Sequence, residues 1–102
     1  MKVEILYFEG CPNHQPTSER VRAVIRDEEL SAEVHEIEVP DAAAAEKVGF
    51  LGSPTIRVNG VDIEPAMRHV RGGSLACRYY PGGIPPMEMI KAALHEAKGR
   101  QG

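Results

Sequence analysis

Alternating apolar residues near the start of the chain predict a strand that is buried on both faces. Over residues 2–8, Val3 and Ile5 would point to one side, and Leu6 and Phe8 to the other. Apolar side chains on both faces are typical of strands in sheets that helices cover on both sides. We therefore expect residues 2–8 to form a central strand.

A helical spacing replaces this alternation after the turn that follows the strand. Val21, Val24 and Ile25 recur at intervals of three and four residues, with charged residues filling the other face. This spacing predicts an amphipathic helix. A proline fits the opening turn of a helix but breaks its interior, so the helix is expected to begin either at Pro12 or at Pro16.

A second strand and a short helix come next. Residues 33–39 alternate again between apolar and polar side chains, which predicts the strand. Asp41 can cap a helix over residues 42–47, because its carboxylate can accept a hydrogen bond from a free N–H of the first turn. The first half of the chain is thus predicted to have the order βαβα.

A β-hairpin opens the second half. Residues 55–58 and 61–64 have the composition of strands and flank Asn59-Gly60. This dipeptide favours the two-residue type I′ turn that joins antiparallel strands.

An irregular segment and a helix complete the chain. Residues 65–85 contain four glycines and three prolines without sustained periodicity, and such long segments in small domains are usually functional or disordered. Pro86 opens a helix with apolar residues at core spacing, and residues 99–102 are expected to fray. The order βαβα-ββα predicts one α/β domain over residues 1–102, with a central mixed sheet flanked by helices.

Composition and charge narrow the classes of partner. The chain has 102 residues, of which 42% are hydrophobic, and a formal net charge of -3 from 12 basic and 15 acidic residues. The interleaved charges give no basic patch for nucleic acid, and no apolar run approaches the ~20 residues that span a bilayer. We expect a cytoplasmic protein without nucleic-acid or membrane partners, and the oligomeric state stays open. Two cysteines are too few for a disulfide-stapled scaffold, so their expected uses are reactive chemistry and metal binding.

Three motifs, taken in order, resemble the thioredoxin and glutaredoxin families. Cys11-Pro12 follows the first strand, GFLGSPT at residues 49–55 is similar to the segment before the family's cis-proline, and IRVNGVDI at residues 56–63 is similar to its terminal hairpin. The resemblance covers nearly the whole chain. It implies a thioredoxin-like fold and a thiol-disulfide oxidoreductase that requires no cofactor.

The resemblance also implies the site residues. Cys11 would be the nucleophile, and Pro12, Ser53, Pro54 and Thr55 would contact the substrate, with a cis bond before Pro54. The Ser53 carbonyl and the Thr55 N–H would then lie beside Cys11, where they could pair with an extended peptide or a thiol substrate.

The sequence departs from these families in two ways that bear on function. His14 stands where a second cysteine would complete the usual dithiol, and residues 65–85, which include Cys77, replace a short link before the last helix. The diglycine with which glutaredoxins help to bind glutathione is missing from the position after the hairpin. Glutathione is therefore not an expected ligand.

Cys11 and His14 are the first pair of candidate catalytic residues. A cysteine at the start of a helix is favoured as a thiolate, because the free N–H groups and the positive helix end stabilise the charge. His14 could act as a general base, as an imidazolium beside the thiolate, or as a second metal ligand. The alternative is an ordinary loop histidine.

Cys77 is the second candidate thiol. It lies in the apolar and aromatic stretch SLACRYYPGG, and a buried structural cysteine is one interpretation of it. The other is that this segment passes over the end of the sheet where Cys11 lies, so that Cys77 resolves a mixed disulfide formed on Cys11.

Two thiolates from separate segments are also a linear site for a soft ion such as Hg(II) or Cu(I). Short thioredoxin-like sequences with the start GCPNHQPT resemble a group often labelled as alkylmercury lyases. By that resemblance Cys11 and Cys77 would hold mercury, with Glu9, Asp62 or Glu64 as the candidate acid. Three hypotheses thus stand together: a thiol redox protein, a soft-metal or organomercurial-binding protein, and a non-catalytic interaction module.

Overall fold

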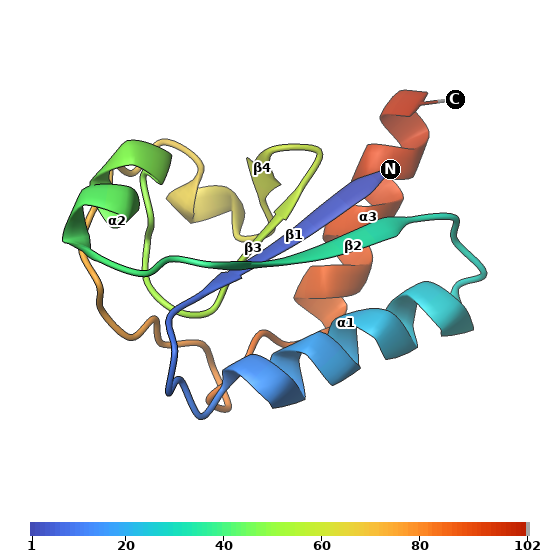
Figure 1. Cartoon of the computed structure of the whole chain (residues 1–102). Helices are drawn as coiled ribbons and strands as arrows, with labels where there is room; N and C mark the ends of the chain where they lie inside the picture. The colour runs from blue at the N-terminus through green and yellow to red at the C-terminus, as the bar shows by residue number, and fades with distance from the viewer. Residues whose placement is uncertain (102) are drawn as a thin grey trace.

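A computed structural model of the chain describes the backbone of residues 1–101 and the side chains of residues 1–99. Figure 1 shows the course of the chain. The described strands are β1 (Lys2–Tyr7), β2 (Glu33–Glu38), β3 (Thr55–Val58) and β4 (Val61–Asp62); the helices are α1 (His14–Asp27), α2 (Ala42–Val48) and α3 (Met87–Gln101), with a short 3-10 turn η1 (Pro65–Met67). This succession confirms the α/β class that the sequence predicts.

The strands form one mixed sheet in the order β2-β1-β3-β4. β1 is parallel to β2 and antiparallel to β3, and β3 is antiparallel to β4. Asn59 and Gly60 both have positive φ, at 51° and 82°, as a type I′ turn requires. β1 is therefore central, and the predicted hairpin is present.

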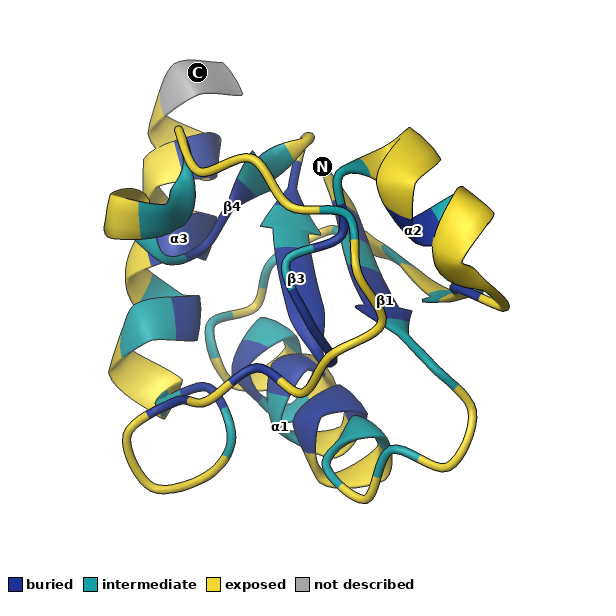
Figure 2. Cartoon of the chain, turned by 90° about the vertical axis from the view of Figure 1, so that its left-hand side faces the viewer, coloured by how far each residue is buried: buried dark blue, intermediate teal, exposed yellow. Residues whose placement is uncertain are grey.

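Helices cover both faces of the sheet. α1 and α3 pack on one face and α2 on the other, with the sheet between them (Figures 1 and 2). The larger core lies under α1 and α3 and includes Val3, Ile5, Val21, Val24, Ile56, Ile90 and Leu94. A smaller core under α2 consists of Leu6, Val39, Ala45 and Phe50. The apolar residues on the two faces of β1 thus enter different cores.

Several element bounds differ from the expectations. β4 ends at Asp62 instead of residue 64, because the Asp62 side chain accepts a hydrogen bond from the Glu64 N–H at 2.8 Å and turns the chain out of the sheet. α2 extends one residue further, to Val48, before Gly49 ends it in a left-handed conformation. Residues 99–102 were expected to fray, but α3 continues through Gly99 to Gln101. Residue 102 lies outside the described part of the chain.

Residues 72–80, which we call the strap, run across the ends of β1 and β3. In both views this segment leaves the region of α2, passes the carboxyl end of β1, and continues toward the start of α3 (Figures 1 and 2). Gly52 and Gly72 allow the close approach, since an added Cβ at Gly52 would lie 2.9 Å from the Arg78 Cβ, and one at Gly72 would overlap the Phe50 carbonyl oxygen. The irregular segment is thus folded against the sheet.

No helix within residues 1–101 combines the length and the apolar character that crossing a membrane requires.

Candidate functional site

Cys11 lies in a tight turn between β1 and α1. Its N–H donates to the Phe8 carbonyl at 3.2 Å, and its own carbonyl accepts from the His14 N–H at 3.3 Å. Gly10, with φ of 88°, allows the chain to reverse just before the cysteine. The Cys11 thiol is partly exposed and has no hydrogen-bond or ion-pair partner among the described residues. It is a free thiol just beyond the carboxyl end of the central strand β1.

The sequence left open whether α1 begins at Pro12 or at Pro16, and the structure gives neither. The helix begins at His14, between these two prolines, and Asn13 is its N-cap. Pro16 then occupies the third helical position, where the missing N–H would have no intrahelical partner. The Asn13 side chain makes no capping bond, and the first turn holds no acidic residue. The only acid that contacts this end of α1 among the described residues therefore comes from β2, and Cys11 lies three residues before the first helical residue.

The His14 side chain is turned toward the sheet. Its ring stacks on Tyr7 with centroids 3.6 Å apart, and its Nε2 lies 2.6 Å from the Glu36 carboxylate on β2. Arg22 donates to the other oxygen of Glu36 at 2.9 Å. His14 therefore fastens the start of α1 to β1 and β2, and in this arrangement it makes no side-chain hydrogen bond to Cys11.

Glu36 carries the charge of this contact. Partial burial alone would raise the pKa of Glu36, but hydrogen bonds from Arg22 and then from His14 outweigh it and lower the pKa below its ordinary value. Both partners favour the ionised carboxylate.

Ser53 joins the Cys11 turn to the strap. The Ser53 hydroxyl accepts from the Phe8 N–H at 3.4 Å, and the peptide bond from Ser53 to Pro54 is cis, the isomer that the resemblance implies. Ser53 also forms a parallel bridge with Cys77. Because Phe8 in turn holds the N–H of Cys11, one buried serine contacts the segments of both cysteines.

The strap uses both main-chain groups of Ser53. The Ser53 N–H donates to the Ala76 carbonyl at 2.8 Å, and the Ser53 carbonyl accepts from the Arg78 N–H at 3.0 Å. The Ser53 carbonyl, which the resemblance implies could pair with a substrate, is therefore bonded within the chain. Cys77, between these two bonds, is exposed and is a free thiol.

A buried ion pair holds the strap in place. Arg78, which is 5% exposed, donates to both carboxylate oxygens of Asp62 at 2.7 and 2.8 Å and to Glu64 at 3.0 Å. Its guanidinium also reaches the Thr55 hydroxyl at 3.3 Å. Asp62 and Glu64 are therefore occupied by Arg78, which the sequence places next to Cys77 without indicating this pairing.

Tyr80 adds a second attachment. Its hydroxyl donates to the Pro54 carbonyl at 2.8 Å, and its ring lies 4.9 Å from the Arg78 guanidinium carbon. Burial raises the pKa of the Tyr80 phenol. For Arg78, burial would lower the pKa, but the bonds to Asp62 and Glu64 outweigh it and raise the pKa. Arg78 and Tyr80 thus stay a cation and a neutral phenol at ordinary pH.

The remaining site candidates have simpler surroundings. Pro12 is exposed beside Cys11, and Thr55 is buried, with its hydroxyl donating to the Gly52 carbonyl at 2.5 Å. Within residues 1–101 no cluster of three or more His, Cys, Asp and Glu side chains has the arrangement of a metal site. A two-thiolate site falls below that number of ligands.

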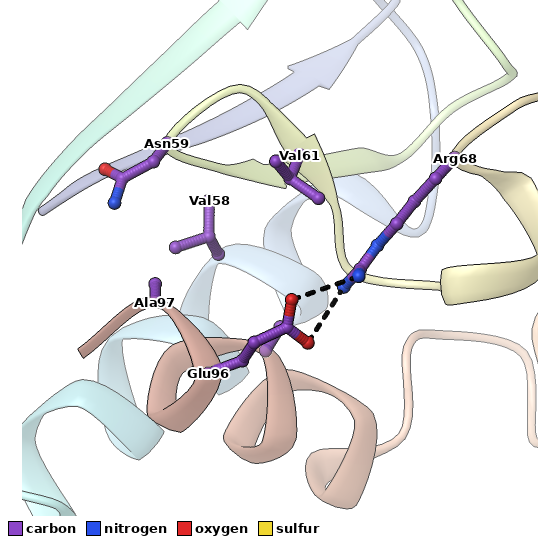
Figure 3. Close-up of a pocket in the computed structure, with 7 residues that line it drawn as sticks. Val58, Asn59, Val61, Arg68, Glu96 and Ala97 are labelled. Carbon is purple, nitrogen blue, oxygen red and sulfur yellow. Dashed lines mark hydrogen bonds and ion pairs between the residues drawn. The ribbon is translucent and has the colours of Figure 1, made fainter. Parts of the chain in front are cut away.

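A separate small pocket lies at the other end of the sheet. It occupies about 90 Å³ between the β3–β4 hairpin and α3, and Figure 3 shows the Arg68–Glu96 ion pair beside it. The Asn59 N–H bonds to the Lys2 carbonyl, so this pocket adjoins the start of β1, whereas Cys11 follows its end. It is not part of the cysteine site.

Known protein families, curated proteins and solved structures include no match to this chain.

Arg78 is expected to be the residue on which the strap depends. Arg78→Met should lower the free energy of unfolding by about 3–5 kcal/mol, because it leaves the buried Asp62 carboxylate without its partner. Urea denaturation followed by circular dichroism measures this loss. The exposed Arg26→Met on α1 is the control and should change the free energy by less than about 0.5 kcal/mol.

The double variant Asp62→Leu/Arg78→Met tests the pairing itself. Removing both charges should recover most of the loss, since no buried charge is then left unpaired. A double variant as unstable as Arg78→Met alone would contradict the ion pair.

Glu36 is expected to contribute to the acid sensitivity of the fold. Its pKa is depressed in the folded chain, so it stabilises the fold above the ordinary value of 4.5, and this contribution is lost as the pH falls through the folded pKa. Glu36→Gln should therefore lose less stability than the parent between about pH 7 and about pH 3, as measured by urea titrations. The exposed Glu29→Gln is the control and should follow the parent; a Glu36→Gln curve parallel to the parent would refute the assignment.

Proposed function

We propose that this chain is a thiol-dependent redox protein with a thioredoxin-like fold, in which Cys11 is the nucleophile and Cys77 the resolving thiol. The observation that carries the proposal is Ser53, which bonds to Phe8 in the Cys11 turn and bridges to Cys77 in the strap. The shared anchor supports the proposal because it holds the segments of two free thiols close to one another, and thiol–disulfide exchange within a chain requires two thiols that can meet.

The fold assignment has support in the topology. The mixed sheet, the β3–β4 hairpin and the cis bond at Pro54 agree with the fold expected from the sequence and its resemblance. The dithiol of those families is replaced by one cysteine before α1 and one in the strap. The cytoplasmic location expected for the chain would supply the reducing thiols that its turnover requires.

Cys11 precedes the first turn of α1, so its role as nucleophile is proposed from its partial exposure and its free thiol, not from the helix end. His14 serves as a positioning residue, since its stack on Tyr7 and its bond to Glu36 hold the helix end against the sheet.

The reaction proceeds by two exchanges. The Cys11 thiolate attacks one sulfur of a disulfide RS–SR′, so that a Cys11–SR bond forms, the RS–SR′ bond breaks, and R′S⁻ leaves to take a proton from water. The Cys77 thiolate then attacks the Cys11 sulfur, which forms the Cys11–Cys77 disulfide and releases RS⁻. Two electrons have passed to the substrate, and a low-molecular-weight thiol or a protein dithiol returns them by the reverse exchanges.

A second proposal, soft-metal binding, uses the same thiols. Both cysteines are free and at least partly accessible, and two thiolates satisfy an ion that prefers linear sulfur coordination. The acid that organomercurial cleavage would need is harder to supply from the hairpin, because Arg78 occupies the carboxylates of Asp62 and Glu64.

The redox proposal predicts different failures for the two cysteines. Cys11→Ser should abolish reduction of a small disulfide in the presence of a thiol reductant. Cys77→Ser should instead accumulate a mixed disulfide on Cys11, visible by mass spectrometry as one added substrate thiol. Ser74→Ala, also exposed in the strap, is the control and should turn over like the parent. Unchanged turnover in Cys11→Ser would refute the proposal.

Mercury titration distinguishes the second proposal. Binding through both thiols should give one Hg(II) per chain. Either Cys11→Ser or Cys77→Ser should lose much of this affinity, as measured by competition with a small thiol. If Cys77→Ser bound Hg(II) as tightly as the parent, the two-thiolate site would be wrong.

A further inference from the structure

The strap restricts which substrates can reach Cys11. An extended peptide that paired with Ser53 would have to displace Ala76 and Arg78 from its N–H and carbonyl groups. Displacing Arg78 would also leave Asp62 buried without its partner, which is costly. The surface left for a substrate must therefore lie elsewhere around the Cys11 turn.

A depression of about 330 Å³ adjoins this turn. It lies between the ends of β1 and β2 on one side and the strap on the other, and its lining consists of Phe8, Glu9, Glu38, Val39, Pro40 and Leu75. Phe8 both lines the depression and accepts the hydrogen bond from the Cys11 N–H. A group bound here would be held next to the nucleophile.

The depression combines an apolar floor with negative charge. Four of its lining residues are apolar, and the two charged ones, Glu9 and Glu38, are both exposed carboxylates. Neither carboxylate has an ion-pair partner among the described residues, and the lining contains no lysine or arginine. Glu36, nearby on β2, is already paired with Arg22 and His14.

We propose that this depression binds the substituent of a small disulfide substrate, and that it selects apolar or aminoalkyl substituents over anionic ones. The inference rests on the proposed redox function and adds the substrate class. An ammonium group beside Glu9 and Glu38 is attracted while the carbon chain covers Val39 and Leu75, and a carboxylate-bearing substituent is repelled. Disulfides with several carboxylates, such as glutathione disulfide, are poor substrates by this account.

Charged thiol reagents test the selection independently of turnover. In a Cys77→Ser chain, Cys11 is the only thiol, and its rates with aminoethyl and sulfonatoethyl methanethiosulfonate can be compared. The ratio of the two rates cancels the reactivity of the thiolate itself, and the same ratio for the chain in denaturant is the reference. We expect the folded ratio to favour the cationic reagent by about tenfold more than the reference at low salt, and this preference to shrink at about 1 M salt.

Charge-neutralising variants assign the effect to the depression. Glu9→Gln/Glu38→Gln, in the same background, should bring the ratio close to the denatured reference. Glu29→Gln, an exposed carboxylate at the opposite end of α1, should leave it unchanged. An equal ratio in the folded and denatured chains, or a ratio that the double variant does not alter, would overturn the proposal.

Substrate turnover provides the second arm. The parent should reduce cystamine faster than bis(hydroxyethyl) disulfide, and this faster than glutathione disulfide, each relative to a free thiol. Faster reduction of glutathione disulfide or of a disulfide in an unfolded protein would overturn the substrate class. A preserved reagent ratio without any turnover would instead refute the redox function and leave the charge selection standing.

Discussion

The buried pair of Arg78 and Asp62 is the interaction on which the shape of the cysteine site depends. It joins a strap that otherwise has few apolar contacts to a hairpin that belongs to the sheet. Desolvating two charges is expensive unless their hydrogen bonds are satisfied, and here Glu64 and Thr55 take two further donors of the guanidinium. The Arg78 Nε is buried without a partner among the described residues, so the desolvation of this N–H is a cost that the ion pair has to offset.

This pair determines which groups bond to Ser53, because it holds the strap against it. A residue that heads a strand could offer its N–H and carbonyl to another molecule, but here the strap takes both and brings Cys77 alongside. The N–H and carbonyl of Ser53 are thus bonded to the strap and are not open to a substrate. Two cysteines that lie far apart in the sequence come to share one anchor, and the negative depression beside Phe8 becomes the accessible face.

Local patterns are sufficient for most of the fold and for little of this site. Periodicity, Asn59-Gly60 and Asp41 identify the elements because each depends on neighbours in the sequence. The Arg78 pairing and the Tyr7–His14 stack depend on residues brought together only by folding, and an arginine in a glycine-rich segment carries no signal that it is buried. The start of α1 at His14 was likewise undetermined, since both prolines are compatible with an opening turn.

The few apolar attachments of the strap also bear on its dynamics. Of the large apolar side chains in the strap, Leu75 and Tyr79 are exposed and Tyr80 is buried, whereas the sheet and α3 share a continuous core. Residues 63–71, which include η1, separate the strap from β4, and residues 81–86 separate it from α3, so the strap can detach as a local unfolding unit while the remainder stays native. Amide hydrogen exchange at residues 76–78 would then occur through this sub-global opening, at a rate set by the Arg78 contacts. Each such opening would briefly uncover the peptide groups of Ser53, so the time during which Cys77 is held beside its anchor depends on how firmly Arg78 and Tyr80 hold the strap to the sheet.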